Sequence, residues 1–420
     1  MAAAQQLSHV YPLGSSVNDL GRIAISGCDT VELAREFGTP AYVVAEDDIR
    51  ARAKAFVTAF AARSDDFEIT FASKAFPCTA LYRLLWEEGI GCDVAGGGEL
   101  ALALAAGIDP AKIHLHGNAK TAEEVAFALR VGVGSIVVDN LRDIGLIEAL
   151  RESAAPAVSV LLRIAPGVSP ETHPSISTGG PNTKFGFDLR HAPAAIERAR
   201  ASAAIDLQGL HMHIGSQILE LDPFREAIQA VAGLGDFPVY NLGGGLGIAY
   251  AADDVVPGIE EYAAAKIAAV HDILGPGKRI IDEPGRALVG ASTVTLYTVQ
   301  TVKQNVDTYV AVDGGMSDNL RPMLYGARYE AQISGRLGGG TRCHIVGKHC
   351  ESGDVIVRDA DLAQPQSGDV IVIPATGAYG HAMANTYNGA LRPPVIFCSG
   401  GDARIVVRRE TYEDLVARDV

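Results

Sequence analysis

The sequence contains no long hydrophobic run. Although 48% of its 420 residues are hydrophobic, no apolar stretch approaches the roughly 18 residues that a membrane-spanning helix needs. The first ten residues, MAAAQQLSHV, also lack the basic region and the apolar stretch of an export signal. We therefore expect a soluble protein that stays in the cytoplasm.

Positive charge is in short supply as well. The chain has 35 Lys and Arg residues against 50 Asp and Glu residues, which gives a formal net charge of −15 at pH 7. Nucleic acids and anionic membranes are bound through basic patches that reach phosphates or displace counterions. The acidic balance disfavours both classes of partner and favours an enzyme that acts on small molecules.

Cysteine is scarce and shows no motif spacing. The six cysteines are Cys28, Cys78, Cys92, Cys343, Cys350 and Cys398. None of them belongs to a CxxC pair, which argues against a zinc ribbon and against the disulfide framework of a small secreted protein. Reduced thiols in the cytoplasm are the simplest interpretation.

The sequence does contain a regular alternation of short β-like runs and Ala-rich helical stretches between about residues 68 and 290. The eight runs are EITFASK, IGCDVA, IHLHGN, SIVVDN, VSVLLRI, LQGLHMHIG, VYNLGGG and RIIDEPG. The first five begin about 22 residues apart, with helical segments such as LYRLLWEEG between them, and this is the spacing of successive βα units. The pattern predicts a (β/α)8 barrel of the TIM type, with a doubly wound α/β fold as the alternative.

The last third of the chain has a different pattern. STVTLYTVQTV, TYVAVDGG, DVIVRDA, DVIVIPA and ARIVVRRE are strand-like and are separated by Gly and Asp turns rather than by amphipathic helices. The chain also exceeds the roughly 250–300 residues at which one hydrophobic core stops growing. We predict an N-terminal segment (1–40) that joins the second domain, a barrel (41–290) and a C-terminal all-β domain (291–420).

Residues with reactive or ligand-binding groups follow several of the predicted barrel strands. They are Lys74, His116, His213, Ser216, the glycine-rich run 243–247, Glu283 and Arg286. In a parallel barrel the carboxyl ends of the strands form the active face. We therefore expect these side chains to converge, although a lone lysine at a strand end is more often solvated or ion-paired.

The run GGGLG has two possible uses. It does not match GxGxxG, so no dinucleotide site is predicted. Its backbone amides could bind a single phosphate, but a tight turn without a ligand would have the same sequence.

Two HxH pairs offer a different interpretation of the same face. IHLHGN and LHMHIG each place two imidazoles on one side of a strand, and histidine is the commonest metal ligand. A metal-dependent barrel hydrolase is therefore an alternative. Against it, the face offers few carboxylates beyond Asp282 and Glu283, and a charged lysine is a poor metal ligand.

The groups fit together best around one cofactor. A lysine in a partly apolar pocket can bond covalently to an aldehyde. A glycine-rich turn can bind a phosphate, an imidazole can stack on an aromatic ring, and a carboxylate can hold a pyridine nitrogen protonated. These four requirements describe pyridoxal 5'-phosphate, whose ring, with Glu283 at its nitrogen, would stabilise the carbanion left when carbon dioxide departs.

Ten motifs resemble those of the diaminopimelate decarboxylases, in the same order, over about residues 40–410. They are FASKAF, CDVAGGGEL, HGNAK, TKFGF, HMHIGSQ, LGGGLGI, EPGRALVG, DGGMSDNLRPMLYG, GKHCESGDV and ATGAY. This family belongs to the alanine-racemase-like group of pyridoxal phosphate enzymes. The resemblance implies a (β/α)8 barrel followed by a β domain.

The resemblance also implies roles around the cofactor. Lys74 in FASKAF resembles the lysine that bonds to the cofactor aldehyde, His213 the histidine that stacks on the ring, and Glu283 the acid at the pyridine nitrogen. The other implied cofactor contacts are Ser216, Gly244, Gly245, Gly285, Arg286 and Tyr379. In FASKAF, Phe76 stands where many members of the family have a polar residue.

Further roles are implied for the substrate. The residues concerned are Arg286, Arg321, Tyr325, Glu351 and Tyr379. Cys350 resembles the catalytic residue that returns a proton to the carbanion, and Glu351 the acid that receives the distal ammonium. In the family this loop enters the active site of the neighbouring subunit, so a homodimer with shared active sites is implied.

These roles predict the decarboxylation of meso-2,6-diaminopimelate to L-lysine and carbon dioxide, the last step of lysine biosynthesis, with no metal. The Ser-Gly-Asp after Glu351 favours this substrate, because decarboxylases of ornithine or arginine usually have CDG-like residues there. Two alternatives stay open: a sister pyridoxal phosphate decarboxylase for another diamino acid or a carrier-linked substrate, and the metal-dependent hydrolase.

Overall fold

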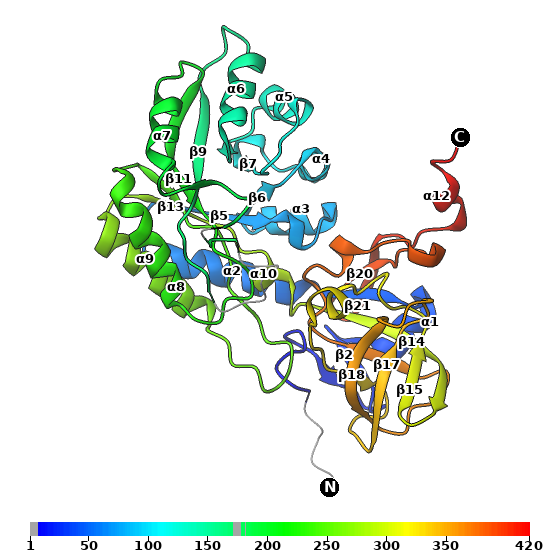
Figure 1. The fold of residues 1–420 in the computed structure, drawn as a ribbon. Coiled ribbons are helices and arrows are strands. Elements are labelled where there is room, and N and C mark those ends of the chain that lie inside the picture. Colours follow the sequence, from blue (N-terminus) through cyan, green and yellow to red (C-terminus); the bar gives the residue numbers. More distant parts are fainter. Residues whose placement is uncertain (1–6, 171–177, 181) are drawn as a thin grey trace. The chain divides into compact units, whose positions relative to one another are not determined.

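The computed structural model describes residues 7–170, 178–180 and 182–420, and it divides into two compact units. The barrel unit comprises residues 52–247 and 256–287, and the β unit comprises the chain up to Ala51, residues 248–255 and residues 288–420. The elements of both units are drawn in Figure 1. None of the described helices is long and apolar enough to cross a membrane.

The barrel unit is built on eight parallel strands that close into a ring. They are β5 (Phe67–Ala72), β6 (Gly91–Val94), β7 (Ile113–Leu115), β8 (Ser135–Val138), β9 (Val158–Ala165), β11 (Ile205–Met212), β12 (Val239–Asn241) and β13 (Arg279–Asp282). Closure is complete because β8 pairs with β9 and β13 pairs with β5. Buried Val137, Leu161, Val239 and Ile281 pack together from four of these strands. The predicted (β/α)8 barrel is confirmed, and each of the eight predicted runs overlaps one of its strands.

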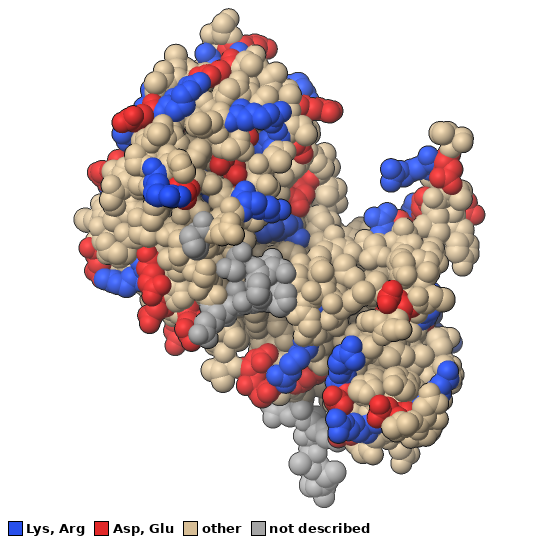
Figure 2. All heavy atoms as spheres, viewed as in Figure 1, with Lys and Arg blue, Asp and Glu red and all other residues tan. Residues whose placement is uncertain are grey.

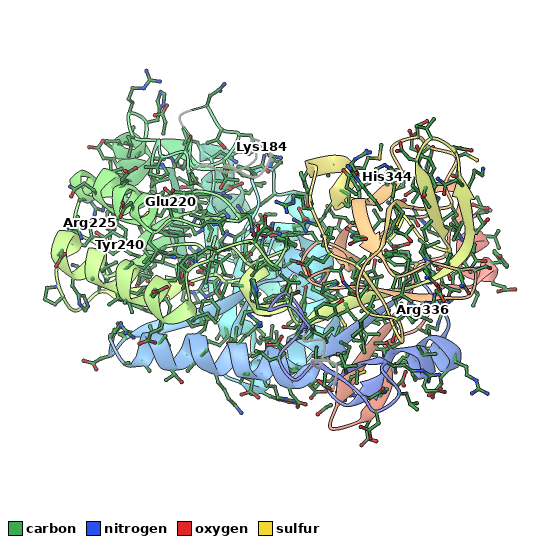
Figure 3. The ribbon with its side chains drawn as sticks, turned by 90° about the horizontal axis from the view of Figure 1, so that it is seen from below. Lys184, Glu220, Arg225, Tyr240, Arg336 and His344 are labelled. Atoms are coloured by element: carbon green, nitrogen blue, oxygen red, sulfur yellow. The ribbon has the colours of Figure 1, made fainter. Side chains whose placement is uncertain are left out.

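Helices alternate with the strands and surround them (Figure 1). They are α2 (Glu46–Ala61), α3 (Thr79–Glu87), α4 (Gly97–Ala105), α5 (Ala122–Val131), α6 (Leu141–Leu150), α7 (Ala192–Arg200), α8 (Asp222–Val231), α9 (Ile259–Leu274) and the short α10 (Arg286–Val289). Smaller elements are η1 (Ser73–Ala75), η2 (Pro110–Lys112), η4 (Ala232–Leu234) and β10 (Phe187–Asp188), which pairs with β9. Arg225 on α8, labelled in Figure 3, forms a surface ion pair with Asp272 on α9 at 3.1 Å.

Local sequence signals set the helix ends, as α5 illustrates. The Thr121 hydroxyl accepts a hydrogen bond from the Glu124 amide, and the Glu124 carboxylate accepts one from the Thr121 amide. This reciprocal pair satisfies amides that the first turn of a helix leaves unpaired. The helix ends at Gly132, whose φ of 74° is accessible to glycine at little cost.

The β unit consists mainly of two sheets. The small sheet contains β1 (Ser16–Val17), β2 (Ile23–Ile25) and β3 (Cys28–Asp29). The large sheet has the order β18 (Val355–Leu362), β17 (Thr341–Val346), β15 (Thr308–Val312), β14 (Thr293–Gln304), β4 (Ala41–Ala45), β20 (Val395–Ser399) and β21 (Asp402–Val407), with β19 (Val370–Ile373) on β14 and β16 (Gln332–Ile333) on β19. The helical elements are α1 (Thr30–Phe37), α11 (Arg321–Tyr325), α12 (Tyr412–Val416), η5 (His381–Met383) and η6 (Tyr387–Gly389). A β-rich second domain is therefore confirmed, with short helices added to it.

The unit boundaries differ from the predicted ranges at the start of the barrel, in residues 248–255 and at the end of the barrel, which lies at Ala287 instead of residue 290. The prediction that the barrel begins at residue 41 includes β4, but β4 pairs with β14 and β20 in the large sheet of the β unit. All five of its residues are buried there, because it is an interior strand. Residues 248–255 also belong to the β unit rather than to the barrel. Of the predicted N-terminal segment, residues 1–6 lie outside the described chain.

The surface carries charges of both signs. On the face shown in Figure 2, Lys and Arg are interspersed with Asp and Glu. No patch of a single charge dominates this face.

Candidate active site

A buried carboxylate, Glu283, follows β13 and is surrounded by polar side chains from neighbouring strands. His211 Nε2 lies 3.2 Å from Oε2, and His116 Nε2 lies 3.0 Å from Oε1. The Asn241 amide, at the end of β12, donates a hydrogen bond of 2.5 Å to Oε1. The barrel therefore brings Glu283 together with residues of β11, β12 and the loop after β7.

The charge state of this cluster follows from its surroundings. Burial alone would raise the pKa of Glu283, but attraction to His116 and His211 and their hydrogen bonds hold it well below its usual range. Burial lowers the pKa of His211 to about 3. At neutral pH an ionised carboxylate therefore faces a neutral imidazole, and it is able to accept a proton-bearing nitrogen.

Lys74 lies in η1, directly after β5. Its Nζ is 3.7 Å from Asp93 Oδ2 on β6, and 45% of its side chain is exposed. Taken alone, this is the solvated, ion-paired lysine that the sequence by itself favours. Exposure also leaves the amine accessible, which covalent attachment of a cofactor requires. Phe76 is 1% exposed and packs in the interior.

His213 follows β11 and is half-buried. Burial, together with the positive charges of Lys74 and Arg163, lowers its pKa well below the usual value. Its Nδ1 is buried and has no hydrogen-bond partner among the described residues. A neutral ring with an unsatisfied nitrogen suits a residue that stacks on a planar ligand.

Glycines and Arg286 form a cradle beside Glu283. Nε and Nη2 of Arg286 donate to Ser216 Oγ at 3.2 and 3.1 Å. A Cβ on Gly244 would collide with the carbonyl oxygen of Glu283. Gly245 has a φ of 123°, and the Gly215 carbonyl oxygen lies 2.8 Å from the position that a Cβ would take there. Glycine is therefore required here by close backbone approach.

Gly285 also lies close to the backbone of another strand end, that of β5, which precedes Lys74. A Cβ on Gly285 would lie 3.0 Å from the Cβ of Ala72, at the end of β5. The unsatisfied His213 nitrogen, the glycine cradle and the ionised Glu283 together fit a flat ligand that carries a phosphate and a ring nitrogen. Pyridoxal phosphate has these features.

The same cluster also meets the minimum requirement for a metal. Ligand atoms of His116, His211 and Glu283 lie within 4.8 Å of one another, and two imidazoles with a carboxylate suit zinc. The cluster takes only one histidine from each predicted HxH pair, however. His114 Nδ1 bonds to Ser135 Oγ at 2.6 Å instead. The geometry alone leaves both a pyridoxal phosphate site and a metal site open. A metal site would not explain the position of Lys74 or the glycine cradle.

The β unit holds the other predicted residues, beginning with Arg321 at the start of α11. Its guanidinium carbon lies 4.4 Å from the centre of the Tyr250 ring, and Nη1 donates to the Tyr329 hydroxyl. Arg321 Nε is buried without a partner among the described residues. The Arg321 guanidinium is therefore held in place by two tyrosines, and its Nε could donate a hydrogen bond to a ligand. Tyr325, at the end of α11, is half-buried.

Cys350 and Glu351 lie on an exposed loop. The Cys350 amide donates to Asn388 Oδ1 at 2.9 Å. Tyr379 is half-buried and has a φ of 65°, a left-handed conformation that a residue other than glycine rarely adopts. The predicted site residues thus form two groups: those that surround Lys74 and Glu283 in the barrel unit, and those on loops of the β unit.

Several polar residues of the barrel cluster escaped the sequence analysis. Asp93 lies on β6, Asn241 ends β12, and Arg163 on β9 has its guanidinium carbon 4.3 Å from the centre of the Phe185 ring. Each is a charged or amide residue inside an otherwise apolar strand. That exception to the strand pattern was the available signal.

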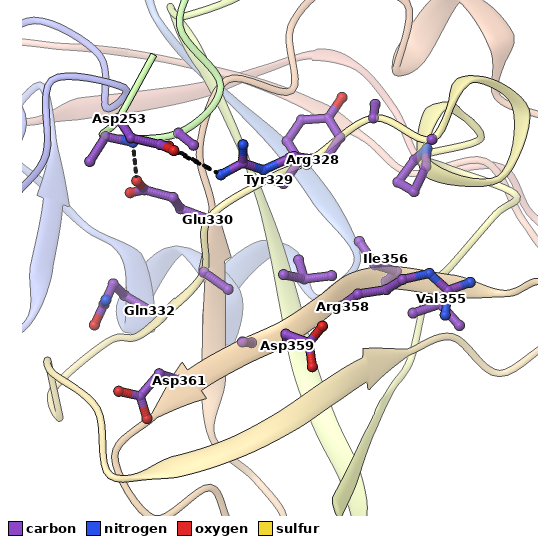
Figure 4. Close-up of a pocket in the computed structure, with 18 residues that line it drawn as sticks. Asp253, Arg328, Tyr329, Glu330, Gln332, Val355, Ile356, Arg358, Asp359 and Asp361 are labelled. Atoms are coloured by element: carbon purple, nitrogen blue, oxygen red, sulfur yellow. Dashed lines mark hydrogen bonds and ion pairs between the residues drawn. The ribbon is translucent and has the colours of Figure 1, made fainter. Parts of the chain in front are cut away.

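A groove of about 670 Å³ in the β unit holds none of the predicted site residues. Figure 4 shows Asp253, Arg328 and Glu330 along one side and residues of β18, including Arg358 and Asp359, along the other. The ion pair between Arg328 and Asp253, at 3.1 Å, spans part of it. Cavity size alone would therefore point away from the candidate site.

Comparison with known proteins decides between the two interpretations of the barrel cluster. Residues 46–290 match the family described as "Pyridoxal-dependent decarboxylase, pyridoxal binding domain". Diaminopimelate decarboxylase of Bacillus subtilis (strain 168) is 44% identical, and the match covers 97% of each chain. The chain belongs to the diaminopimelate decarboxylase family.

Solved structures of the family are similar over most of their length. Diaminopimelate decarboxylase from M. jannaschii in complex with L-lysine is 35% identical, with a TM-score of 0.91 and 97% of each chain covered. The enzyme from Helicobacter pylori complexed with L-lysine is 32% identical, with a TM-score of 0.86, 92% of this chain and 98% of that chain covered. Family membership confirms the predicted carboxy-lyase class and the pyridoxal cofactor, and it favours them over the metal-dependent hydrolase.

Proposed function

We propose that the protein decarboxylates meso-2,6-diaminopimelate to L-lysine and carbon dioxide, the last step of lysine biosynthesis. The observation that carries the proposal is the buried, ionised Glu283 in the same barrel as the accessible Lys74 and the glycine cradle. The full-length similarity to diaminopimelate decarboxylases supports the choice of substrate.

The barrel residues would hold the cofactor and control its protons. When bound, pyridoxal phosphate supplies an aldehyde for an amine and a ring that accepts the electrons of the breaking carbon–carbon bond. Lys74 would attach the cofactor and then yield its place to the substrate amine, with Asp93 close enough to stabilise the displaced ammonium. Glu283 would keep a proton on the ring nitrogen, and His213 would pack against the ring face.

The phosphate would lie in the cradle beside these groups. Ser216, Gly244, Gly245 and Arg286 supply a hydroxyl, backbone amides and a guanidinium, which are the usual donors to a phosphate. Gly285 gives these loops room to approach β5. Their role is to fix the cofactor so that the reacting bond keeps its orientation.

Arg286 of the barrel unit and several residues of the β unit would bind the substrate. The guanidinium groups of Arg286 and Arg321 suit carboxylates, and Tyr325 and Tyr379 offer hydroxyls. Glu351 would accept the distal ammonium of the substrate. The Cys350 thiol would return a proton to the α-carbon after carbon dioxide leaves, and the Lys74 amine would then take back its place on the cofactor and release L-lysine.

Replacement of Lys74 tests the proposal. Lys74→Ala should abolish release of carbon dioxide and lysine from meso-diaminopimelate, and it should remove the cofactor that borohydride traps on the protein. Lys112→Ala is a matched control, because Lys112 is also ion-paired, to Glu68 at 3.6 Å, with 43% of its side chain exposed. The control should retain both properties.

Two outcomes would contradict the proposal. Full turnover in Lys74→Ala would exclude the assigned chemistry, and inactivation of the wild type by a chelator would favour the metal cluster instead. Competition with ornithine and arginine would show whether the enzyme belongs to a sister decarboxylase, since neither should displace diaminopimelate.

We also propose a homodimer in which each active site is completed by the partner. Cys350 and Glu351 are exposed, and the apolar side chains of Met323 and Leu324 beside this loop are 46% and 49% exposed. The Met323 side chain lies over Gly353 of the loop, within 3.3 Å of the position a Cβ would take there. A functional loop beside exposed apolar groups is typical of an interface.

Mixed dimers test this arrangement. Lys74→Ala and Cys350→Ala should each be inactive alone, whereas an equal mixture should recover about a quarter of wild-type activity, because half of the dimers then contain one intact site of two. No recovery in a mixture that exchanges subunits would place both residues of a site on one chain.

We further propose a cytoplasmic location. All six cysteines are free thiols, as in a reducing compartment. Fractionation of cells that express the protein tests this directly.

A further inference from the structure

A lysine with no role in the proposed chemistry is buried behind the cradle. Lys266 lies on α9, and its side chain is 1% exposed. Its Nζ pairs with Asp282 Oδ1 and hydrogen-bonds to the Tyr262 hydroxyl at 2.7 Å and to the Gly243 carbonyl at 2.9 Å. A fully buried lysine is rare in proteins unless it is paired.

The contacts of Lys266 connect the two loops that face the cofactor. Gly243 is the first glycine of GGGLG, and Lys266 Nζ also lies 3.3 Å from the carbonyl oxygen of Leu242. Asp282 is the residue before Glu283. The Gly243 carbonyl oxygen also accepts the Glu283 amide at 3.2 Å. One ammonium group is therefore bonded to the start of the phosphate cradle and to the strand end that carries the ring-nitrogen acid.

Stability alone does not account for this arrangement. Burial lowers the pKa of Lys266 and raises that of Asp282, so desolvation opposes the charged pair. Well-packed apolar residues of similar volume are often as stable as a buried ion pair. The rings of Tyr262 and Phe224, with centres 4.6 and 4.9 Å from Nζ, would accommodate an apolar side chain.

We propose that Lys266 is a positioning residue that fixes the separation between the phosphate cradle and the Glu283 carboxylate. In pyridoxal phosphate a single methylene group joins the phosphate to the ring that contains the nitrogen, which limits how far apart the two can lie. A protein that binds both must hold its two sets of groups at a matching separation. The inference rests on the proposed cofactor site and extends it to a residue that touches neither cofactor nor substrate.

A second buried pair in the barrel unit provides a matched control. Lys120 Nζ lies 2.9 Å from Asp143 Oδ2 and donates to the carbonyl oxygens of Gly117 and Val137. Its side chain is also 1% exposed. Lys120 has the same kind of contacts as Lys266, but none of them involves the GGGLG loop or Asp282.

The experiment compares Lys266→Met with Lys120→Met in the full chain. Both variants should unfold at a lower urea concentration, because each leaves a buried aspartate unpaired. Only Lys266→Met should weaken pyridoxal phosphate binding, by about tenfold or more, and shift the pH titration of the visible absorbance of the bound cofactor. The affinity of Lys120→Met should stay within about twofold of wild type.

A double variant separates positioning from stability. Lys266→Met combined with Asp282→Asn removes both charges, so its unfolding midpoint should recover toward wild type while cofactor affinity stays weak. Recovery of affinity together with stability would overturn the proposal. If Lys266→Met does not fold, Tyr262→Phe removes one partner of the ammonium and should weaken cofactor binding in the same direction.

Failure of the cofactor assignment would look different. A wild-type protein that does not bind pyridoxal phosphate would overturn the site itself. Wild-type binding with unchanged affinity and absorbance in Lys266→Met would leave the site intact and overturn only the role of Lys266.

Discussion

The barrel unit and the β unit bury acidic side chains in different ways. In the barrel unit, Asp282 pairs with a lysine from α9, Asp143 pairs with Lys120, and Glu283 lies among imidazoles. These partners come from strands, helices and the loops between them. The barrel brings together groups that are distant in sequence.

In the β unit, the buried acid Asp318 has neutral partners instead. Asp318 accepts hydrogen bonds from the Tyr297 hydroxyl and from the Gly315 amide, the latter at 2.9 Å. Burial raises the pKa of Asp318 to about 7, whereas Glu283 stays ionised. Both acids are buried, but only Glu283 lies against imidazoles whose interactions lower its pKa, so burial alone does not set the charge of an acid.

Neutralising Glu283 should have the largest effect. Glu283→Gln keeps the shape of the side chain but removes the charge that holds a proton on the ring nitrogen, so kcat should fall by about 10²–10³. Steady-state kinetics with saturating cofactor would measure this. A kcat within twofold of wild type would show that the barrel cluster does not need its charge.

Neutralising Glu351 in the β unit should act on the substrate instead. Glu351→Gln should raise KM for diaminopimelate by about 10–100-fold, the worth of a hydrogen bond to a charged group, with the cofactor absorbance unchanged. Glu351 is exposed, so the fold should tolerate the change. A lower cofactor affinity with normal KM would assign this loop to the cofactor.

Removal of the Ser216 hydroxyl should have a smaller effect in the barrel unit. Ser216→Ala loses one neutral donor and the hydrogen bonds that Arg286 makes to it, so the Kd for pyridoxal phosphate should rise by about 3–10-fold. Titration of the apoprotein followed by absorbance would measure it. An unchanged Kd would place the phosphate elsewhere.

Asp318 gives the smallest expected effect, on the pH dependence of stability. Its folded pKa of about 7 lies above the usual value of about 3.9 for an unfolded aspartate. Its contribution is therefore fully present below about pH 4 and is lost as pH rises through about 7. Urea unfolding of Asp318→Asn should lack this decline over that window.

His211 should contribute in the opposite direction. Its folded pKa of about 3 lies below the usual 6.5, so its contribution is present above about pH 6.5 and is lost as pH falls toward 3. The Asp318→Asn variant keeps the contribution of His211 but lacks the decline at Asp318. Its free energy of unfolding should therefore rise relative to that of the wild type as the pH approaches about 7. Identical pH profiles for the variant and the wild type would refute the raised pKa of Asp318.

The fold was predictable where the spacing of β-like runs in the sequence equals the spacing of βα units in the structure. The eight β-like runs at βα spacing identified the barrel. The assignment of β4 to the barrel was wrong because AYVVA has the same apolar pattern whether a strand lies in a barrel or inside another sheet. Only its pairing with β14 and β20 distinguishes the two.

The candidate site was predictable only in part, for a related reason. Lys74 and Glu283 are reactive groups directly after strands, and the sequence shows that position. The proposed roles of Asp93 and Lys266 depend on contacts with residues that are distant in the sequence. No local sequence pattern predicts such contacts. The two HxH pairs raised a metal site only as an alternative, and in the structure His114 is bonded to Ser135 and Glu68 instead.

The place of β4 in the chain has a consequence for biosynthesis. A ribosome makes β4 before the barrel and makes both of its hydrogen-bonding neighbours, β14 and β20, after it. Domains fold as they emerge. All strands of the barrel are therefore present while both edges of β4 (AYVVA) still lack their hydrogen-bonding partners. Such a strand promotes aggregation, and a messenger truncated after the barrel is expected to yield insoluble protein.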